Sequence, residues 1–449
     1  MHTTVAELAS TLQTVFTTDA EQAARDAGLI RRVRQFSGAT FVQTVVFGWL
    51  DNPNATHEDL AEVAAELGLD ITADALGRRL GQPACDCLLE VLHQALNHVI
   101  AAQPAALPLL RRFRGVYVRD GSTVSLPAAL AAVLPGCGGS GPGQGSAALK
   151  LLPQLELLTG ALDALRLLPG KDSERGDELA WAPLPEGALL LEDLGFFNLE
   201  RLRHYDSQKV SFLSRLPTRL CLWNGQGHKQ TLAGFLRGQR GSTVDEWVEV
   251  GAEARLRVRL LAERVPEAVA RKRQERLRRR ASKKGRAVSA DGLELCRWNV
   301  LITNIPEQRL SLREAQVLRR VRWQVELLFK VWKSEGRVDE SRGRKPYRVL
   351  CEVLAKLLGQ VVQHWLSLVA GGSPLLYSQR RAARRVRRVA LRLLRALASV
   401  RRLQQVLGQL RCRLQRHCRV RSRKGGRQPA TFQILLNPQQ DGCHTLDPC

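Results

Sequence analysis

Two short apolar runs, each followed closely by an aspartate, constrain the fold of this 449-residue chain more than any other feature. Residues 116–118 read Val-Tyr-Val before Asp120, and residues 189–191 are all Leu before Asp193. Short apolar runs bounded by turn residues are typical of buried strands. A charge at the rim of a buried strand is costly unless it is paired or metal-bound. The pattern predicts a site built on strand ends; the alternative is ordinary strand-end acids that bond turn amides.

A third acid lies on a predicted helix that spans residues 311–333. Arg322, Glu326, Phe329 and Lys333 recur at helical spacing, so they share one face of this helix. One acid and two bases therefore lie along a stripe that also carries an aromatic ring. Taken alone, Arg322 and Glu326 fit a surface ion pair worth only ~0.3–0.5 kcal/mol equally well.

Positive charge is concentrated in two segments. The chain has 68 Lys and Arg against 43 Asp and Glu, for a net charge of +25. Residues 380–427 carry 18 Lys and Arg and no acid, and residues 271–286 carry ten with one Glu, so the rest is close to neutral. A polyanionic partner is predicted, with RNA or a membrane surface as lesser alternatives to DNA. Apolar residues at helical spacing within 386–397 predict one basic amphipathic helix.

No segment is predicted to span a membrane. In the most apolar stretch, residues 353–370, Lys356, Gln360, Gln363 and His364 interrupt the run, which suits a core helix better. The N-terminus lacks the basic start and long apolar run of a signal peptide. Ten cysteines without such a signal predict reduced thiols.

The acidic motifs resemble those of a known enzyme family. They are the Asp-Gly-Ser at 120–122, the Asp-Leu-Gly-Phe-Phe at 193–197, and the Arg, Glu and Lys at 322, 326 and 333. In order and spacing they are similar to the three motifs of bacterial insertion-sequence DDE transposases with a YREK signature (insertion sequence family four). The resemblance covers roughly residues 110–350, and the long gap before Glu326 accommodates the family's strand-rich insertion.

The resemblance implies that Asp120, Asp193 and Glu326 are the catalytic triad and bind the metal. Two Mg²⁺ (or Mn²⁺) ions are expected to act on the attacking and leaving oxygens of a phosphoryl transfer. The resemblance also implies that Arg322 and Lys333 contact DNA phosphates near the cleaved end.

Three further residues take roles from the same comparison. Trp298 falls where relatives place an aromatic ring that holds a flipped base; a core Trp of the insertion is the alternative. Arg215 resembles another phosphate contact. Arg319 stands where the signature has its tyrosine, and an arginine still binds phosphate but lacks the stacking surface.

The implied fold is a mixed α/β (α+β) chain with an RNase H-like core, in which Asp120 lies on the first strand and Asp193 follows the fourth. The predicted segments are a helical N-terminal DNA-binding region (1–108), the first part of the core (109–216), a β-rich insertion with a basic arm (217–304), the second part of the core (305–375) and an Arg-rich C-terminal region (376–449).

The implied function is cut-and-paste transposition by strand cleavage and strand transfer. The expected partners are the double-stranded terminal inverted repeats, the target DNA and a second copy of the chain, with no membrane and a cytoplasmic, nucleoid-associated location. One alternative is a catalytically impaired relative that only binds DNA, which Arg319 favours. Another is an RNase H-like nuclease that cleaves without strand transfer.

Overall fold

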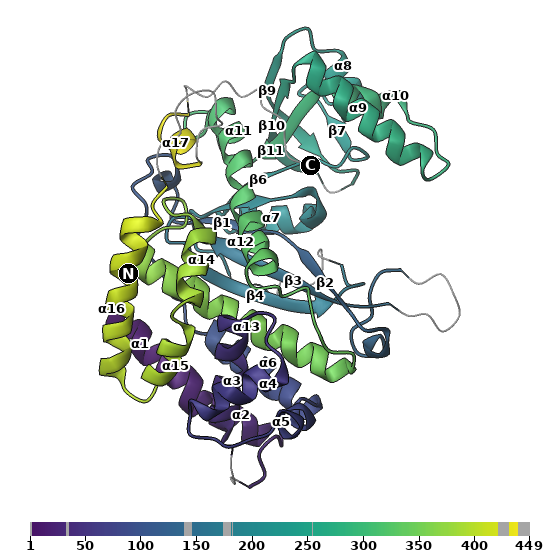
Figure 1. Cartoon of the computed structure of the whole chain (residues 1–449). Coiled ribbons are helices and arrows are strands. Elements are labelled where there is room, and N and C mark those ends of the chain that lie inside the picture. Colours follow the sequence, from purple (N-terminus) through teal and green to yellow (C-terminus); the bar gives the residue numbers. More distant parts are fainter. Residues whose placement is uncertain are drawn as a thin grey trace. The chain divides into compact units, whose positions relative to one another are not determined.

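The computed structural model describes residues 2–32, 36–138, 146–173, 181, 183–253, 255–420 and 431–438. The chain divides into two compact units, which are described separately (Figure 1). The first unit comprises Met1–Ala106, Asp120–Ser173 and Gln324–Arg423, and the second comprises Leu107–Arg119, Glu174–Trp323 and Lys424–Cys449. The five predicted segments are continuous in sequence, whereas these two units are not, so the boundaries of the segments stay predictions.

Helices dominate the first unit, and the N-terminal region is helical as predicted. Thr4, Ser37 and Thr56 begin three of these helices with reciprocal capping boxes, which satisfy backbone amides that would otherwise lack partners. The helices are α1 (Val5–Thr14), a π-helical turn (Val15–Asp19), α2 (Ala20–Asp26), α3 (Gly38–Asp51), α4 (His57–Ala65), α5 (Ala73–Arg79), α6 (Gln82–Leu96), α12 (Trp323–Ser334), α13 (Pro346–Gly371), α14 (Gln379–Arg387), α15 (Ala390–Ala396) and α16 (Val400–His417).

Helix α13 is the central helix of the first unit, and α1, α3, α6, α14 and α16 lie against it (Figure 1). Among the described helices it alone is long and apolar enough to cross a membrane by length and composition. However, 89% of its most apolar 18-residue stretch is buried inside the fold, as predicted for a core helix. The polar residues that interrupt this helix are buried too. Lys356 Nζ lies 2.7 Å from Glu352 Oε1 and donates to the carbonyl oxygen of Glu340 at 2.8 Å.

The Arg-rich region is helical, but the prediction of one amphipathic helix over residues 386–397 is wrong. Helix α14 ends at Arg387, α15 begins at Ala390, and Val389 between them has a non-helical backbone (φ −119°, ψ 6°). The apolar spacing continues through this break, so periodicity does not reveal it. The apolar members are buried in the first unit, namely Val386, Val389, Leu393, Leu394 and Leu397.

Three antiparallel strands complete the first unit: β2 (Ser122–Leu126), β3 (Ala147–Glu156) and β4 (Leu162–Pro169). As predicted, β3 and β4 form a hairpin that turns at Thr159 and Gly160. Gly160 adopts φ +74°, which favours glycine, and a Cβ there would lie 2.3 Å from Pro374 Cδ.

The second unit contains a mixed sheet with the strand order β1-β5-β6-β11-β10-β9-β7-β8. β1, β5 and β6 are parallel to one another, and the remaining neighbours are antiparallel. The strands are β1 (Val116–Arg119), β5 (Leu189–Glu192), β6 (Ser211–Ser214), β7 (Cys221–Trp223), β8 (Lys229–Thr231), β9 (Thr243–Val250), β10 (Leu256–Arg264) and β11 (Trp298–Thr303). The helices are α7 (Leu199–Ser207), α8 (Leu232–Arg237), α9 (Glu267–Ser282), α10 (Ala290–Leu295), α11 (Leu312–Val321) and α17 (Thr431–Leu436).

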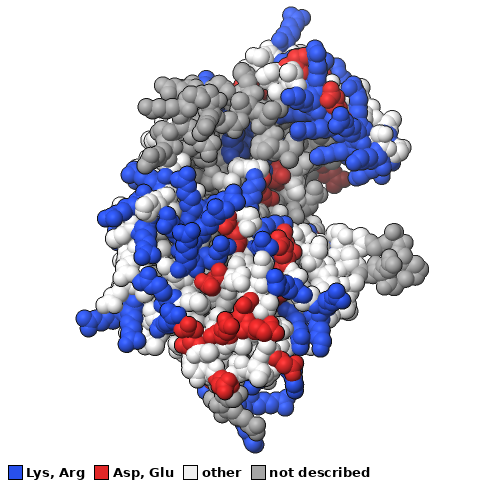
Figure 2. Space-filling model, in the orientation of Figure 1, with Lys and Arg blue, Asp and Glu red and all other residues white. Residues whose placement is uncertain are grey.

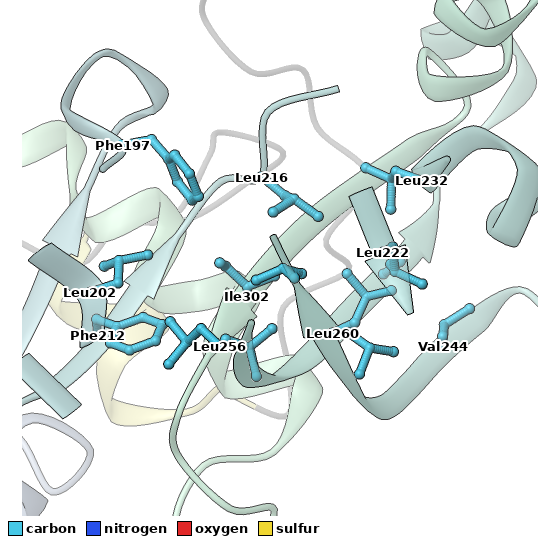
Figure 3. Packing of buried hydrophobic residues seen from close by; sticks show 14 of the residues in the cluster. Phe197, Leu202, Phe212, Leu216, Leu222, Leu232, Val244, Leu256, Leu260 and Ile302 are labelled. Carbon is cyan, nitrogen blue, oxygen red and sulfur yellow. The ribbon is translucent and has the colours of Figure 1, made fainter. Parts of the chain in front are cut away.

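One hydrophobic cluster holds this sheet together (Figure 3). Phe212, Leu260 and Ile302 project from β6, β10 and β11, and each is at most 1% exposed. Side chains of α7 and α8, including Leu202 and Leu232, belong to the same cluster. Burial of these groups at roughly 25 cal/mol per Å² of apolar surface is the main stabilising contribution to the sheet. The β-rich insertion and the strands that precede it therefore share one core.

The predicted strand count needs one correction. Asp193 follows β5, the fifth strand in chain order, and not the fourth. The reason is that the chain leaves the ladder at Asp120 and Gly121, so the first apolar run is β1 and a separate strand, β2, begins at Ser122.

We predict that the buried His364 makes stability depend on pH. Its Nε2 donates to the carbonyl oxygen of Gly160 at 2.8 Å. Burial lowers the pKa of His364 below its ordinary value of 6.5, and this hydrogen bond opposes the effect only in part. Below pH 6.5 the histidine is protonated in the unfolded chain but stays neutral in the folded chain. The free energy of unfolding is therefore highest above pH 6.5 and decreases below it.

Chemical unfolding at pH 7.5 and pH 5.5 measures this effect. Wild type is expected to lose up to ~1.4 kcal/mol more per pH unit below 6.5 than His364→Gln, which cannot be protonated. Equal pH dependence in both proteins would contradict the assignment.

Candidate active site

Asp120 is the first residue after β1, at the carboxyl end of that strand. It is half-buried, and its Oδ1 accepts the backbone N–H of Gly121 at 2.8 Å. The chain leaves β1 at this point and enters β2 at Ser122. The carboxylate is thus held at a strand end, as predicted.

Asp193 is the first residue after β5 and keeps an extended backbone (φ −86°, ψ 167°). Its side chain is 34% exposed, but Oδ1 is buried and has no hydrogen-bond partner among the described residues. The nearest cation is Arg215, whose Nη1 lies 3.8 Å from Oδ1, which is too far for a hydrogen bond. A buried carboxylate oxygen without a donor is costly unless a cation or a bound water completes it. Its surroundings therefore fit a ligand for a hard divalent cation.

Glu326 and Lys333 lie on α12, seven residues apart, and both are half-buried. Lys333 Nζ donates to the carbonyl oxygen of Thr123 in β2 at 3.3 Å and lies 4.0 Å from Asp339. Because β2 begins two residues after Asp120, this bond brings the end of α12 to the strand that follows the first acid. Within the first unit, two of the three predicted motifs are therefore linked.

A further contact fixes the end of α12. Glu335, two residues after Lys333, is only 8% exposed and accepts hydrogen bonds from Arg380 at 2.7 Å and from Arg384 at 3.0 Å. Burial works to raise the pKa of Glu335, but the hydrogen bonds from Arg384 and Arg380 lower it overall. Two arginines of α14 thus have an internal partner.

The predicted helix over residues 311–333 is wrong as one continuous helix. The capping box of Ser311 and Glu314 is confirmed, but α11 ends at Val321 and α12 begins at Trp323. Arg322 between them keeps helical angles (φ −49°, ψ −30°), and the apolar spacing continues across it, so the sequence pattern carries no sign of the interruption. Arg319, on α11, donates from Nε to Gln316 Oε1 at 3.1 Å.

Trp298 opens β11 and is only 3% exposed. Its Nε1 donates to Glu294 Oε1 at 3.0 Å, and the Arg264 guanidinium lies 4.5 Å from the ring centroid. The ring also belongs to the hydrophobic cluster of this sheet. This position favours the core alternative, and the base-holding role stays a prediction that requires the ring to leave the core.

The predicted site residues are divided between the two units. Asp120, Glu326 and Lys333 belong to the first, whereas Asp193, Arg215, Trp298, Arg319 and Arg322 belong to the second. Within either unit the described residues contain no group of three or more His, Cys, Asp and Glu side chains able to hold a metal ion. The convergence of the three acids therefore stays a prediction.

A buried charge cluster lies next to the aspartates, and the sequence reading missed it. Arg119 and Glu192 directly precede Asp120 and Asp193, are 0% and 3% exposed, and approach to 3.4 Å between Nη1 and Oε1. Arg201 of α7 contacts the other carboxylate oxygen of Glu192 at 3.1 Å. The available signal was a charged residue inside each apolar run, immediately before the acid. Such residues are rarely buried unless they are paired.

The comparisons with known proteins agree with these motifs. Residues 162–359 match the family model described as "Transposase DDE domain", a region that includes Asp193 and Glu326. The chain is 26% identical over 363 residues to the transposase for insertion sequence element IS231F of Bacillus thuringiensis subsp. israelensis. The aligned region covers 75% of each chain. It is also 28% identical over 304 residues to the transposase for insertion sequence element IS421 of Escherichia coli. The aligned region covers 63% of this chain and 81% of the relative.

These similarities show a DNA transposase related to those of insertion sequences, with the DDE domain match over residues 162–359. A third relative, the transposase for insertion sequence element IS1151 of Clostridium perfringens, is 23% identical over 363 residues, or 75% of each chain. A DDE transposase depends on divalent metal ions in general, and the unpartnered Oδ1 of Asp193 fits that requirement in this transposase.

We predict that Glu192→Gln destabilises the transposase by ~3–5 kcal/mol, because two buried guanidinium groups lose their counter-charge. Thermal unfolding of the full chain measures the loss. Glu186→Gln is the matched control: Glu186 pairs with Lys209 at 3.0 Å, but both side chains are more than 60% exposed, so a change below ~0.5 kcal/mol is expected. Equal effects of both substitutions would argue against a buried cluster.

We also predict that Trp298→Ala lowers stability by ~3–5 kcal/mol, as expected for the loss of a buried aromatic ring. Trp298→Phe, which keeps most of the apolar volume, is expected to cost less. Unfolding midpoints measure both effects. If Trp298→Ala unfolds like wild type but fails on DNA ends, the ring acts on a base and not in the core.

Proposed function

We propose that this transposase performs cut-and-paste transposition, with Asp120, Asp193 and Glu326 as its catalytic carboxylates. The observation that carries the proposal is the register of β1 and β5, in which Val116 pairs with Leu189 and Val118 with Leu191. Each partner is 73 residues further along the chain. Asp120 and Asp193 directly follow these two strands and are separated by the same 73 residues.

The third proposed acid, Glu326, lies on α12, the helix whose Lys333 contacts β2. The bond from Lys333 to Thr123 ties this helix to β2, three residues after Asp120. Glu326 lies two turns before Lys333 on the helix, ~10 Å along its axis. This arrangement supports Glu326 as the third carboxylate and Lys333 as a phosphate contact.

The three carboxylates are proposed to hold two Mg²⁺ (or Mn²⁺) ions. When bound, such ions stabilise the negative charge on the attacking and leaving oxygens of a phosphodiester displacement. Arg215, close to Asp193, and Arg322 and Arg319 near the α11–α12 junction would bind the flanking phosphates. Trp298 would hold a flipped base only if it leaves the core.

Cleavage and joining are two displacements at phosphorus. Water first attacks a phosphodiester at the element end and releases a 3′-hydroxyl, and that hydroxyl then attacks a second phosphodiester. The proposed substrates are the double-stranded terminal inverted repeats and target DNA, held by a dimer in the nucleoid of the cytoplasm. The three parallel strands β1, β5 and β6 support an RNase H-like core for residues 109–216 and 305–375, with 217–304 as its insertion.

A second candidate function is DNA binding without catalysis. Arg319 favours it, because the side chain at this signature position lacks a ring for stacking. The Asp193 Oδ1, which has no hydrogen-bond donor among the described residues, and the bonded Lys333 favour catalysis.

Cleavage of the element's own end DNA tests the proposal. With Mg²⁺, wild type is expected to nick the end and join it to target DNA, whereas Asp193→Ala is expected to nick at least ~100-fold more slowly while still binding DNA. Asp74→Ala is the matched control, since Asp74 is an exposed acid paired with Arg78 outside the proposed site. Mg²⁺ is also expected to raise the melting temperature of wild type more than that of Asp193→Ala.

Each other outcome selects an alternative. If wild type binds the end DNA tightly but does not nick it, the protein functions in DNA binding without catalysis. Nicking unaffected by Asp193→Ala would remove the residue assignment. Hydrolysis without joining would leave a nuclease.

A further inference from the structure

Most residues of helix α9 in the second unit are exposed. Of its 16 residues only Ala270 is fully buried. Seven of the others are Lys or Arg and two are Glu. Figure 2 shows Lys and Arg side chains gathered over this part of the molecule. A helix that is polar nearly all round is stabilised little by packing, and its like charges four residues apart are each destabilising by ~0.2–0.5 kcal/mol.

The first half of α9 is nevertheless firmly anchored. Arg273 donates to the carbonyl oxygen of Trp298 at 3.2 Å and to Asn299 Oδ1 at 2.8 Å. Gln274 donates to the carbonyl oxygen of Leu293 at 3.1 Å, which ties the helix to α10. The helix is therefore held at a defined position while its second half stays exposed.

The cationic side chains in the second half of α9 and in the turn after it point to a partner outside the fold. Arg278, Arg279 and Arg280, with Lys283 and Lys284 in the following turn, are all exposed. Their side chains make no hydrogen bond or ion pair with the other described residues, whereas two arginines of α14 pair with Glu335. These side chains are positioned for a partner outside the chain.

The distribution of charge indicates the shape of that partner. At 100° per residue the Lys and Arg of α9 cover about 200° of its circumference, and the remaining side carries Ala270 and Leu277. A helix that rests on one phosphate strand needs cations along one side only. Cations on two sides suit a helix that lies between two phosphate strands, as in a groove of a duplex.

We propose that α9 lies in the major groove of duplex DNA, an inference that rests on the proposed function. With side chains an α-helix is ~10–12 Å wide and the major groove of B-DNA is ~12 Å wide. The 16 residues of α9 give it a length of ~24 Å, enough to follow the groove for several base pairs. Duplex RNA is a poor fit because its major groove is deep and narrow.

Salt dependence and methylation protection test the proposal together. In the full chain, Arg278→Gln, Arg279→Gln and Arg280→Gln combined are expected to reduce the slope of log affinity against log salt by up to ~2.7, since each phosphate contact contributes ~0.9. Protection of guanine N7, which faces the major groove, is expected to disappear over one short segment of the end DNA. Half-maximal nicking is expected to require more of the variant protein, because its affinity for the end DNA is lower.

The matched control removes three cations that already have acidic partners. Arg255→Gln, Lys209→Asn and Arg337→Asn together cause the same loss of net charge, and asparagine tolerates the left-handed backbone of Lys209 and Arg337. This control is expected to change the slope by less than about 1 and to keep N7 protection. If the triple variant of α9 does not fold, Arg279→Gln alone replaces it, with an expected change in slope of ~1.

The other outcomes overturn the proposal. A reduced slope with intact N7 protection means that α9 contacts phosphates outside the groove. Unchanged slope and protection mean that α9 does not touch the DNA. Equal affinity for duplex RNA of the same sequence, lost in the α9 variant, contradicts the groove geometry. A wild-type chain that neither binds nor nicks end DNA removes the proposed function itself, whereas failure of the α9 proposal alone leaves nicking intact.

Discussion

Parallel pairing of β1 with β5 is the constraint on which the candidate site depends. The register sets residues of β1 opposite residues 73 positions later, and the same offset separates Asp120 from Asp193. Arg119 and Glu192 neutralise each other directly before these acids, with Arg201 on the far side of the carboxylate. The strand ends can therefore carry charge beside an apolar core, because Arg119 and Glu192 are paired inside the fold.

The charges of this chain are divided according to their environment. Buried cations such as Arg119, Lys356 and Arg259 each have an acidic partner inside the fold, since an unpaired buried charge is costly. The excess positive charge lies on α9 and on α14–α16, where Figure 2 shows blue surfaces. On α14 to α16 the apolar residues pack inward, so the arginines cover a docked surface. Helix α9 has no comparable apolar face, so it packs less closely against its unit than α14–α16 do.

Local patterns in the sequence located most elements. Alternation and apolar runs gave strands near 116–119, 189–192 and 298–303, and the capping residues of α11 were correct. Two helical regions, however, are interrupted where the apolar spacing continues without a change, at Arg322 and at Val389. Periodicity reports which face of a helix is apolar, but it does not report whether each backbone hydrogen bond forms.

The sequence by itself determined that this chain carries three acids in the order and spacing of a DDE transposase, because that information lies in residue identity and distance along the chain. Only the tertiary structure decided which groups the predicted site residues contact. It revealed that Asp193 Oδ1 lacks a donor, that Lys333 bonds to the strand after Asp120, and that Trp298 lies in a core. The physical reason is that burial and pairing depend on contacts between segments far apart in the chain, which no local pattern records.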